Sequence, residues 1–353
     1  MEIGGNFNLH IDFLYNSHYF DGCEYTFLNS GRACIAQISQ AIGPGTILLP
    51  SYICPSMTHW RQNIVYYPMK PELPLQIDYE WVEAYITNNS IAAILMVHYF
   101  GVIDPKIKKI QHLCITRNIK LIEDITHSWL EDNQVFGDIQ LCSLRKTLPL
   151  PDGAFMRGCT IKTQPKYQYY YFYILKILAM LLKCMTWLKF IWYPIFIKLE
   201  MLMDRYNQEM TWITFWLINR LDIHAIKMQR RANYNYLLNK LGNIALYKIP
   251  DLTFGFPIIL EDSFTRNKLR QTLICEKIYP PIHWTLPTVT MCENARWVSD
   301  RILTIPIDQR YNLKHMQKII DVINEGGYNQ GNSGIGFSPG IKISQFKINP
   351  LFT

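Results

Sequence analysis

Short apolar runs in the first half of the chain alternate with segments of helical periodicity. Each apolar run is brief and rich in aliphatic residues, which predicts a buried strand. Strands separated by helices of about 10 to 15 residues are typical of βαβ units in an α/β protein with a mostly parallel sheet, where ligands bind at the carboxyl ends of the strands. The predicted strands lie at 46–50, 92–100, 119–124, 139–144 and 153–161, and the predicted helices at 32–41 and 105–117.

The second half of the chain has a different pattern. Residues 230–242 predict a linking helix that Gly242 ends. Proline accompanies the three strand-like runs that follow, "FGFPIIL", "YPPIHW" and "LTIPID", which is typical of a small α+β domain. The predicted division is a large domain at 1–228, a small C-terminal domain at 229–328 and a flexible tail at 329–353.

Residues 169–197 form an apolar block that Lys176, Lys183 and Lys189 interrupt. A lysine at the centre of a membrane-spanning helix costs about 2.5 to 3.5 kcal/mol on insertion scales, so a span is disfavoured. Pro194 is expected to break a helix within the block. Two interpretations stay open. The first is a helix pair packed on the body of the protein or in a dimer interface. The second is contact with a membrane surface, in which Lys176 and Lys183 share a helical face and extend to the interface.

Composition narrows the classes of function. With 49% hydrophobic and 18% charged residues, the 353-residue chain is expected to be ordered and globular. Its net charge of +7 favours anionic partners, but the basic residues are dispersed, which disfavours nucleic-acid binding. The cysteines include no CxxC pair, so we predict neither a metal site nor a disulfide framework. The N-terminus shows no secretory signal, and we expect a cytoplasmic protein.

Two polar segments lie where the predicted sheet would bind a ligand. Ser30 and Gly31 precede a predicted helix, whose N-terminal N–H groups can bind a phosphate; an ordinary helix cap is the alternative. The strand "KLIED" ends in Glu123 and Asp124, and His127 follows three residues after Asp124. Taken singly, each of these residues is also compatible with a structural role.

The segment "SLRKTLPLPDGA" places Ser143 three residues before Lys146 and ends in a glycine turn. With the two segments above, it completes the groups that pyridoxal phosphate needs: a helix N-terminus and hydroxyl for the phosphate, a carboxylate for the ring nitrogen and an amine for the aldehyde. Burial and the neighbouring Arg145 would favour the neutral, nucleophilic amine of Lys146. A thiol nucleophile at Cys54 or Cys142 lacks a paired histidine, and both are expected in the core.

These motifs resemble those of a known family through most of the chain. The chain is similar to the DegT/DnrJ/EryC1/StrS sugar aminotransferases, which are pyridoxal-phosphate enzymes of fold type I with a smaller α+β C-terminal domain. The motifs that carry the resemblance are "NSGRACI", "LLPSYICPS", "MVHYFGV", "IEDITHS" and "SLRKTLPLPDGA", followed by "FPIIL", "IHW" and "LTIPIDQRY" in the small domain.

The resemblance implies a role for each matched residue. Lys146 is the implied Schiff-base lysine and general acid/base, Asp124 the partner of the pyridine nitrogen, and His127 a contact to the ring hydroxyl or face. The other implied cofactor contacts are Ser30, Gly31, Arg32 and Ser143 at the phosphate and Tyr52 or Ile53 at the ring.

The activity implied by the resemblance is transamination of a nucleotide-linked keto sugar for surface polysaccharide or lipopolysaccharide biosynthesis. Glutamate is the implied amino donor and a homodimer the implied assembly. The chain departs from the family in its Ser-to-Lys spacing of three and in "PDGA", where the family has "EGG". Two alternatives stay open. A dehydratase of the same fold is expected to lack the lysine, so Lys146 disfavours it. A divergent protein without the chemistry would act as a binding or membrane-associated scaffold.

Overall fold

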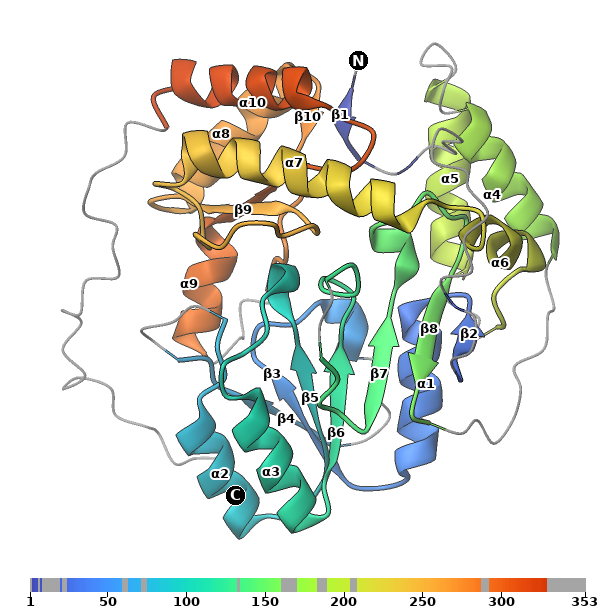
Figure 1. Ribbon diagram of the computed structural model, residues 1–353, viewed down its shortest axis with the longest axis vertical. Coiled ribbons are helices and arrows are strands. Elements are labelled where there is room, and N and C mark those ends of the chain that lie inside the picture. The colour runs from blue at the N-terminus through green and yellow to red at the C-terminus, as the bar shows by residue number, and fades with distance from the viewer. Residues whose placement is uncertain are drawn as a thin grey trace.

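The computed structural model is organised around a central sheet with helices packed against it (Figure 1). The tail predicted at 329–353 lies outside the described residues. The structure describes residues 2–5, 7, 20, 24–58, 63–70, 75–131, 134–159, 170–182, 189–203, 208–286 and 292–328.

Seven strands form the central sheet in the order β2-β8-β7-β6-β5-β3-β4. β8 is antiparallel to both of its neighbours, whereas the other strand pairs are parallel. The predicted α/β fold with a mostly parallel sheet is therefore confirmed. The strands are β2 (Thr26–Leu28), β3 (Thr46–Pro50), β4 (Asn63–Tyr67), β5 (Ile91–Val97), β6 (Lys120–Asp124), β7 (Ile139–Cys142) and β8 (Ala154–Arg157).

Capping side chains begin the helices that connect these strands. The Ser30 hydroxyl accepts a hydrogen bond from the Ala33 N–H at 3.2 Å, and the Asp78 carboxylate accepts one from the Trp81 N–H at 3.1 Å. Both helices predicted for this half of the chain are confirmed. The helices are α1 (Gly31–Ile42), α2 (Tyr79–Asn88) and α3 (Ile107–Arg117), with single 3-10 turns η1 (Pro55–Thr58), η2 (Tyr99–Gly101) and η3 (Leu144–Lys146).

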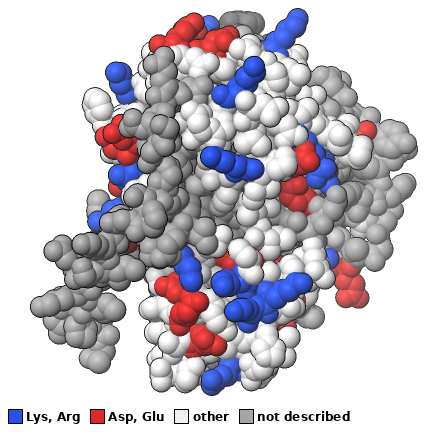
Figure 2. Space-filling model, turned by 60° about the vertical axis from the view of Figure 1, so that its left-hand side comes forward, with Lys and Arg blue, Asp and Glu red and all other residues white. Residues whose placement is uncertain are grey.

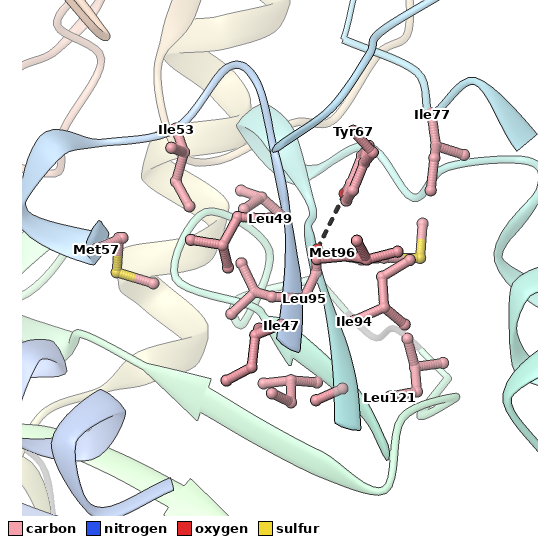
Figure 3. Close-up of a cluster of buried hydrophobic side chains, with 14 of the residues drawn as sticks. Ile47, Leu49, Ile53, Met57, Tyr67, Ile77, Ile94, Leu95, Met96 and Leu121 are labelled. Carbon is pink, nitrogen blue, oxygen red and sulfur yellow. Dashed lines mark hydrogen bonds between the residues drawn. The ribbon is translucent and has the colours of Figure 1, made fainter. Parts of the chain in front are cut away.

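Aliphatic side chains of the central strands form the largest hydrophobic core. Ile47 and Leu49 of β3 lie beside Leu95 of β5, and all three are fully buried (Figure 3). Full burial of such a side chain contributes about 1.5 to 3 kcal/mol. The buried Tyr67 hydroxyl donates a hydrogen bond to the Leu95 carbonyl at 3.0 Å, which satisfies its polar group. This core fixes the ends of β5 and β6, where the candidate site begins.

A second hydrophobic core lies beneath α7 (Ile223–Leu241), which crosses the upper part of the molecule in Figure 1. Asp222 caps α7 by accepting a hydrogen bond from the Ala225 N–H at 2.8 Å, so the helix begins before the predicted 230–242 segment. The predicted domain boundary after residue 228 falls inside α7 and stays a prediction.

The remaining small-domain elements surround this second core. β9 and β11 pair antiparallel, and β1 pairs parallel with β10. Ile3 therefore joins the small-domain core, a contact that the predicted division did not include. The elements are β1 (Ile3–Gly4), β9 (Phe256–Ile259), α8 (Ser263–Cys275), β10 (Ile278–Tyr279), α9 (Glu293–Arg301), β11 (Ile302–Ile305) and α10 (Leu313–Glu325).

The apolar block forms a helix pair, α4 (Tyr170–Leu182) and α5 (Lys189–Met203), and the short helix α6 (Trp212–Ile218) follows. Contrary to our expectation, Pro194 lies inside α5 without breaking it. The proline removes one backbone hydrogen bond, but it is exposed, so solvent can accommodate its ring and hydrate the freed carbonyl. Within the described residues, no helix is long and apolar enough to cross a membrane.

Lys176 contradicts one part of the membrane-contact interpretation, namely the expected position of its own side chain. Its side chain is fully buried, and its ammonium pairs with the Glu200 carboxylate of α5. The expectation that Lys176 extends to a membrane interface is therefore wrong, because an inward-facing carboxylate holds it. Lys183, its expected companion, lies outside the described residues.

Charged side chains are interspersed on the face shown in Figure 2, where blue and red groups alternate with uncharged surface. This face carries no continuous basic stripe of the kind that follows a nucleic-acid backbone.

The "PDGA" turn between η3 and β8 is fixed to two other segments. The buried Asp152 carboxylate accepts hydrogen bonds from the Thr211 N–H and hydroxyl, each at 2.8 Å, and from the Thr214 hydroxyl. Gly153 has a φ of 122°, which L side chains rarely adopt, and its N–H donates to the Asn29 carbonyl at 2.9 Å. The turn therefore joins the start of α6 to the residue before Ser30.

Replacing Gly153 by alanine should lower the free energy of unfolding by about 1 to 3 kcal/mol. A Cβ there would lie 3.1 Å from the Met210 Cε and 3.2 Å from the Thr214 Cγ2, in addition to the strain of the positive φ. Urea denaturation followed by circular dichroism measures the loss. Gly327→Ala is the control, because Gly327 has a φ of 74° and open space around it. Equal losses in the two variants would contradict the contribution of contacts at Gly153.

Candidate functional site

A cavity of about 330 Å³ lies where three parts of the chain meet. Its size falls within the usual range for small-molecule sites. The segment after β7, the α4–α5 helix pair, and α7 with the small domain each form one part of its wall. The charged and aromatic residues that line it are Phe7, Arg145, Lys146, Lys176, Phe196, Glu200, Arg230, Phe254, Tyr279, His283, Asp308 and Arg310.

Ser143 and Lys146 lie on the same 3-10 turn at the cavity wall. The Lys146 N–H donates to the Ser143 carbonyl at 3.2 Å. Because a 3-10 helix has about three residues per turn, residues three apart point in the same direction. The short Ser-to-Lys spacing therefore places hydroxyl and amine on one side of the turn.

The Lys146 side chain is exposed to the cavity, and no described residue makes a hydrogen bond or ion pair with its ammonium. Its charge acts on Asp124, His127 and His283, whose pKa values it lowers. The structure therefore brings Lys146 within electrostatic reach of the carboxylate and the imidazole predicted from "IEDITHS". His283, from "IHW" of the small domain, was not predicted as a site residue.

Asp124 lies at the carboxyl end of β6, as its sequence position predicted. Its Oδ1 accepts a hydrogen bond from the Thr126 N–H at 2.9 Å, which orients the carboxyl group. Burial raises the pKa of Asp124 above its ordinary value. Hydrogen bonds from Thr126 and the charges of His98 and Lys146 lower this pKa, but burial outweighs them. A cationic ring nitrogen beside this carboxyl group would lower its pKa and keep it ionised.

His127 is buried and neutral. Its pKa lies well below the ordinary value, first because of burial and then because of His283 and Lys146. Nδ1 accepts a hydrogen bond from the Phe100 N–H at 3.2 Å, so the proton of the neutral ring is on Nε2. The ring stacks on Phe254, with centroids 3.5 Å apart. One face of His127 is thus covered, and Nε2–H remains as its donor.

The predicted phosphate loop lies against Ser143. A Cβ at position 31 would be 3.3 Å from the Ser143 Cβ and 3.8 Å from its hydroxyl, so Gly31 allows the start of α1 to approach this residue. Ser30 caps the same helix, and Arg32, half-buried, is in its first turn. The structure therefore brings the four predicted phosphate contacts to one place.

Tyr52 and Ile53 are not part of the cavity wall. Both belong to the large hydrophobic core, and Figure 3 shows Ile53 near Leu49. The Tyr52 ring packs on Tyr99 and Trp284, at centroid distances of 5.7 and 5.5 Å. Their predicted contact with a cofactor ring stays a prediction.

The neighbouring cysteines show why a thiolate nucleophile is disfavoured. Cys142 is fully buried at the end of β7, and burial raises the pKa of its thiol well above the ordinary value. The Cys54 thiol is half-buried and lies 3.0 Å from the Ser56 hydroxyl. The environment of Cys142 does not favour the charged form that a nucleophilic cysteine needs.

Arg230 of α7 holds the backbone beside the candidate lysine, and sequence reasoning missed it. The guanidinium is fully buried and donates to the Thr147 and Thr253 carbonyls and to the Gln309 amide oxygen, each at 2.8 Å. Burial lowers its pKa to about 10. No sequence motif accompanies Arg230, and its partners lie up to 83 residues away along the chain, so the sequence did not predict these contacts.

His98 and Glu123 form a buried pair behind the site, with Nε2 and Oε1 2.9 Å apart. Burial alone would raise the pKa of Glu123, but hydrogen bonds from His98, Gln140 and the Gly137 N–H outweigh it, so the pKa is lowered. The pair joins the ends of β5 and β6 and so steadies the strand that ends in Asp124.

A cluster of three charges joins the helix pair to the cavity. The Arg145 guanidinium contacts both Glu200 oxygens at 3.2 Å, and the Lys176 ammonium pairs with the same carboxylate. Burial would raise the pKa of Glu200, but Arg145 and Lys176 hold it at about 2. Burial, followed by Arg145, lowers the pKa of Lys176 to about 8. Glu200 and Lys176 were not predicted as site residues.

Comparison with known proteins agrees with the sequence motifs. Residues 57–135 match the DegT/DnrJ/EryC1/StrS aminotransferase family. This match confirms the family resemblance over "MVHYFGV" and "IEDITHS". No curated protein sequence matches the chain.

Solved aminotransferase structures share the fold over 85% to 91% of this chain. Spr1654 from Streptococcus pneumoniae, described as a sugar aminotransferase in its PLP form, has a TM-score of 0.63 and 14% identity and covers 91% of this chain and 92% of its own. DesI with its TDP-sugar product has a TM-score of 0.62 and 12% identity, covering 85% and 80%. A DegT/DnrJ/EryC1/StrS aminotransferase from Brucella abortus has a TM-score of 0.57 and 16% identity, covering 86% of each chain.

The residues of the site fit pyridoxal phosphate. Because Gly31 lacks a Cβ, the N-terminus of α1 lies against Ser143, so backbone N–H groups and a hydroxyl that suit a phosphate lie together. Lys146 supplies an amine without a partner among the described residues, and Asp124 supplies a carboxylate at a strand end. His127 adds an N–H donor beside them.

Glu200→Gln should destabilise the protein by about 3 to 5 kcal/mol near neutral pH, because the buried Lys176 and the half-buried Arg145 lose their carboxylate. The pKa of Glu200 falls from 4.5 to about 2 in the folded state, so its stabilising contribution is complete above pH 4.5 and is lost as the pH falls toward 2. The difference in unfolding free energy between wild type and variant should therefore shrink in acid.

Urea denaturation at about pH 7, 5 and 3 measures this difference. Glu276→Gln is the control, since Glu276 forms an exposed ion pair with Lys318 at 3.4 Å, and such pairs contribute about 0 to 1 kcal/mol. A difference for Glu200→Gln that does not change with pH would show that its charge is not what stabilises the cluster.

Proposed function

We propose that this protein is a pyridoxal-phosphate-dependent aminotransferase that converts a nucleotide-linked keto sugar to an amino sugar. The observation that carries the proposal is the placement of Lys146: it shares a turn with Ser143, which adjoins Gly31, and its charge acts on Asp124 and His127. The fold shared with sugar aminotransferases supports the same conclusion.

Each group of the site has a distinct role in this proposal. Pyridoxal phosphate supplies an aldehyde that bonds to amines and a ring that accepts electrons. Lys146 would hold the aldehyde, and Ser30, Gly31 and Ser143 would bind the phosphate. Asp124 would keep the ring nitrogen protonated, and the Nε2–H of His127 would donate to the ring oxygen.

Lys146 would also carry the proton transfers. When its Nζ is not bonded to the cofactor, it would move a proton from the substrate α-carbon to the cofactor carbon that carries the amino group. Arg230 holds the Thr147 carbonyl, so the backbone that carries Lys146 stays in place while its side chain moves. The proposed amino donor is glutamate.

The charges of the cavity support an anionic sugar substrate. Arg145, Lys176 and Arg310 line it, against the carboxylates of Glu200 and Asp308. With Lys146 and Arg230 included, the wall has an excess of positive charge, which suits a diphosphate-linked sugar. We further propose a homodimer that serves surface polysaccharide or lipopolysaccharide biosynthesis, in the cytoplasm and peripheral to the inner face of the membrane.

The second candidate is a binding scaffold without aminotransferase activity. It was considered because "PDGA" departs from the "EGG" of the family. The hydrogen bonds of Asp152 and Gly153 make this turn rigid, which favours the enzyme.

Borohydride reduction of the protein with added pyridoxal phosphate should trap a covalent adduct on Lys146. Peptide mapping locates it, and this readout does not depend on turnover. Lys176 lines the same cavity, so the map must distinguish the two lysines. Lys146→Ala should lose the adduct, and Lys198→Ala, an exposed lysine of α5, should keep it. An adduct on Lys176, or none on the folded protein, would overturn the proposal.

Asp124→Asn should leave the Lys146 adduct intact but slow the half-reaction with glutamate by a factor of about 100 or more, since an uncharged amide does not hold the ring nitrogen protonated. Stopped-flow absorbance with excess glutamate measures the rate. Asp78→Asn, which alters a carboxylate that caps α2, is the control. An unchanged rate in Asp124→Asn would place the partner of the ring nitrogen elsewhere.

A further inference from the structure

Exposed apolar side chains concentrate on α4, α5 and α6. Of the 18 large hydrophobic residues exposed in the described part of the chain, 11 belong to these three helices. On α4, Ile174, Leu178 and Leu181 are 51%, 48% and 45% exposed. Their spacing of four and three residues puts them on one side of the helix. The rest of the described surface has only scattered residues of this kind.

The opposite side of the same helix faces the cavity. Lys176 and Met180 of α4 are buried and line it, as does Glu200 of α5. The helix pair thus has an inner face that builds the site and an outer face without a described partner. We define the outer face as Ile174, Leu178, Leu181, Ile191, Ile195 and Lys198.

The outer face continues along α5. Ile191 and Ile195 are 44% and 42% exposed, and Lys198 is exposed three residues beyond Ile195, on the same side of the helix. A lysine in an apolar row can bury its stem in a membrane interface while its ammonium reaches the phosphates. The row therefore combines an apolar surface with a positive end.

Aromatic residues of α6 extend the surface. Trp212 and Trp216 are 61% and 45% exposed, and the Arg220 guanidinium lies 4.2 Å from the Trp216 ring centroid. The α6 cap is bonded to Asp152, whose charge also acts on Lys176, so α6 begins close to α4. Figure 1 shows the three helices together on the right of the molecule. Tryptophan and arginine are typical of the headgroup region of a bilayer.

We propose that the outer face of α4 and α5, with α6 beside it, docks on the surface of a bilayer that contains anionic lipids. This deepens the peripheral membrane contact of the proposed function and does not depend on the chemistry at Lys146. At 1.5 Å per residue, α4 and α5 are about 20 and 22 Å long, short of the roughly 30 Å hydrocarbon core, so they would lie along the interface.

Charge favours lipid over a second copy of this chain. Glu200 is the one acidic residue within α4, α5 and α6 as the structure bounds them, and it is bonded inward to Arg145 and Lys176. A second copy packed through the same face would bring Lys198 into an apolar contact without a carboxylate. Lipid phosphate would supply the negative charge.

Sedimentation with sucrose-loaded vesicles tests the proposal on the full chain loaded with pyridoxal phosphate. Vesicles of phosphatidylcholine with about 30% phosphatidylglycerol should bind the protein, and pure phosphatidylcholine should bind it less, because basic residues are attracted to anionic lipid. Leu178→Glu combined with Ile195→Glu should weaken binding at least about tenfold, since acidic residues are unfavourable in the interface. Lys198→Glu should reduce the preference for phosphatidylglycerol.

Ile115→Glu combined with Phe264→Glu is the matched control, because these residues of α3 and α8 are 72% and 75% exposed. It should bind vesicles as the wild type does. Melting curves and the cofactor absorbance confirm that each variant is folded and loaded, so a failure to bind lipid is distinguishable from a failure of the proposed function. Equal binding of the two double variants would overturn the proposal.

Sedimentation velocity tests whether a second copy of this chain, rather than lipid, covers the outer face. If wild type ignores vesicles and Leu178→Glu combined with Ile195→Glu converts a dimer to a monomer, the outer face is an interface between copies and the membrane proposal is wrong. If wild type binds neither vesicles nor itself through this face, the proposal is also wrong.

Discussion

The buried guanidinium of Arg230 is the interaction on which the arrangement of the site depends. One planar group satisfies acceptors on the backbone after Lys146, on the loop before β9 and on Gln309, and a lysine could not present so many fixed donors. Each hydrogen bond to a charged group contributes about 1.5 to 3 kcal/mol, and an unmatched buried charge would cost more. Arg230 thus joins the large and small parts of the protein beside Lys146.

The α4–α5 helix pair has two different faces, one at the cavity and one exposed. Its inner charges form a cluster with Arg145, the residue before Lys146, and the Tyr173 hydroxyl accepts a hydrogen bond from Asn29, the residue before Ser30, at 3.3 Å. The pair is therefore bonded to both segments that would hold the cofactor. Its exposed apolar side chains form the outer face, whereas Lys176 and Glu200 face the interior.

Local signals predicted the parts of this protein that are built from neighbouring residues. The parallel strands, the Ser30 cap, the strand end at Asp124 and the turn from Ser143 to Lys146 follow from periodicity and from short motifs. Arg230, His283 and Glu200 could not be predicted, because their roles depend on partners distant in sequence. Pro194 and Lys176 were misjudged for a related reason: tertiary contacts and exposure decided whether the helix continued and where the lysine pointed.

The order of synthesis gives the Arg230 contacts a further meaning. Lys146 and Ser143 leave the ribosome early, but the groups that fix their turn, Arg230 and Gln309, follow 83 and 162 residues after Thr147. A nascent chain therefore carries Lys146 on a segment without these hydrogen bonds until most of the sequence has been made. Under the proposed function, binding of pyridoxal phosphate would come late in synthesis, and truncated products that end before Gln309 would contain Lys146 without all the groups that fix its turn.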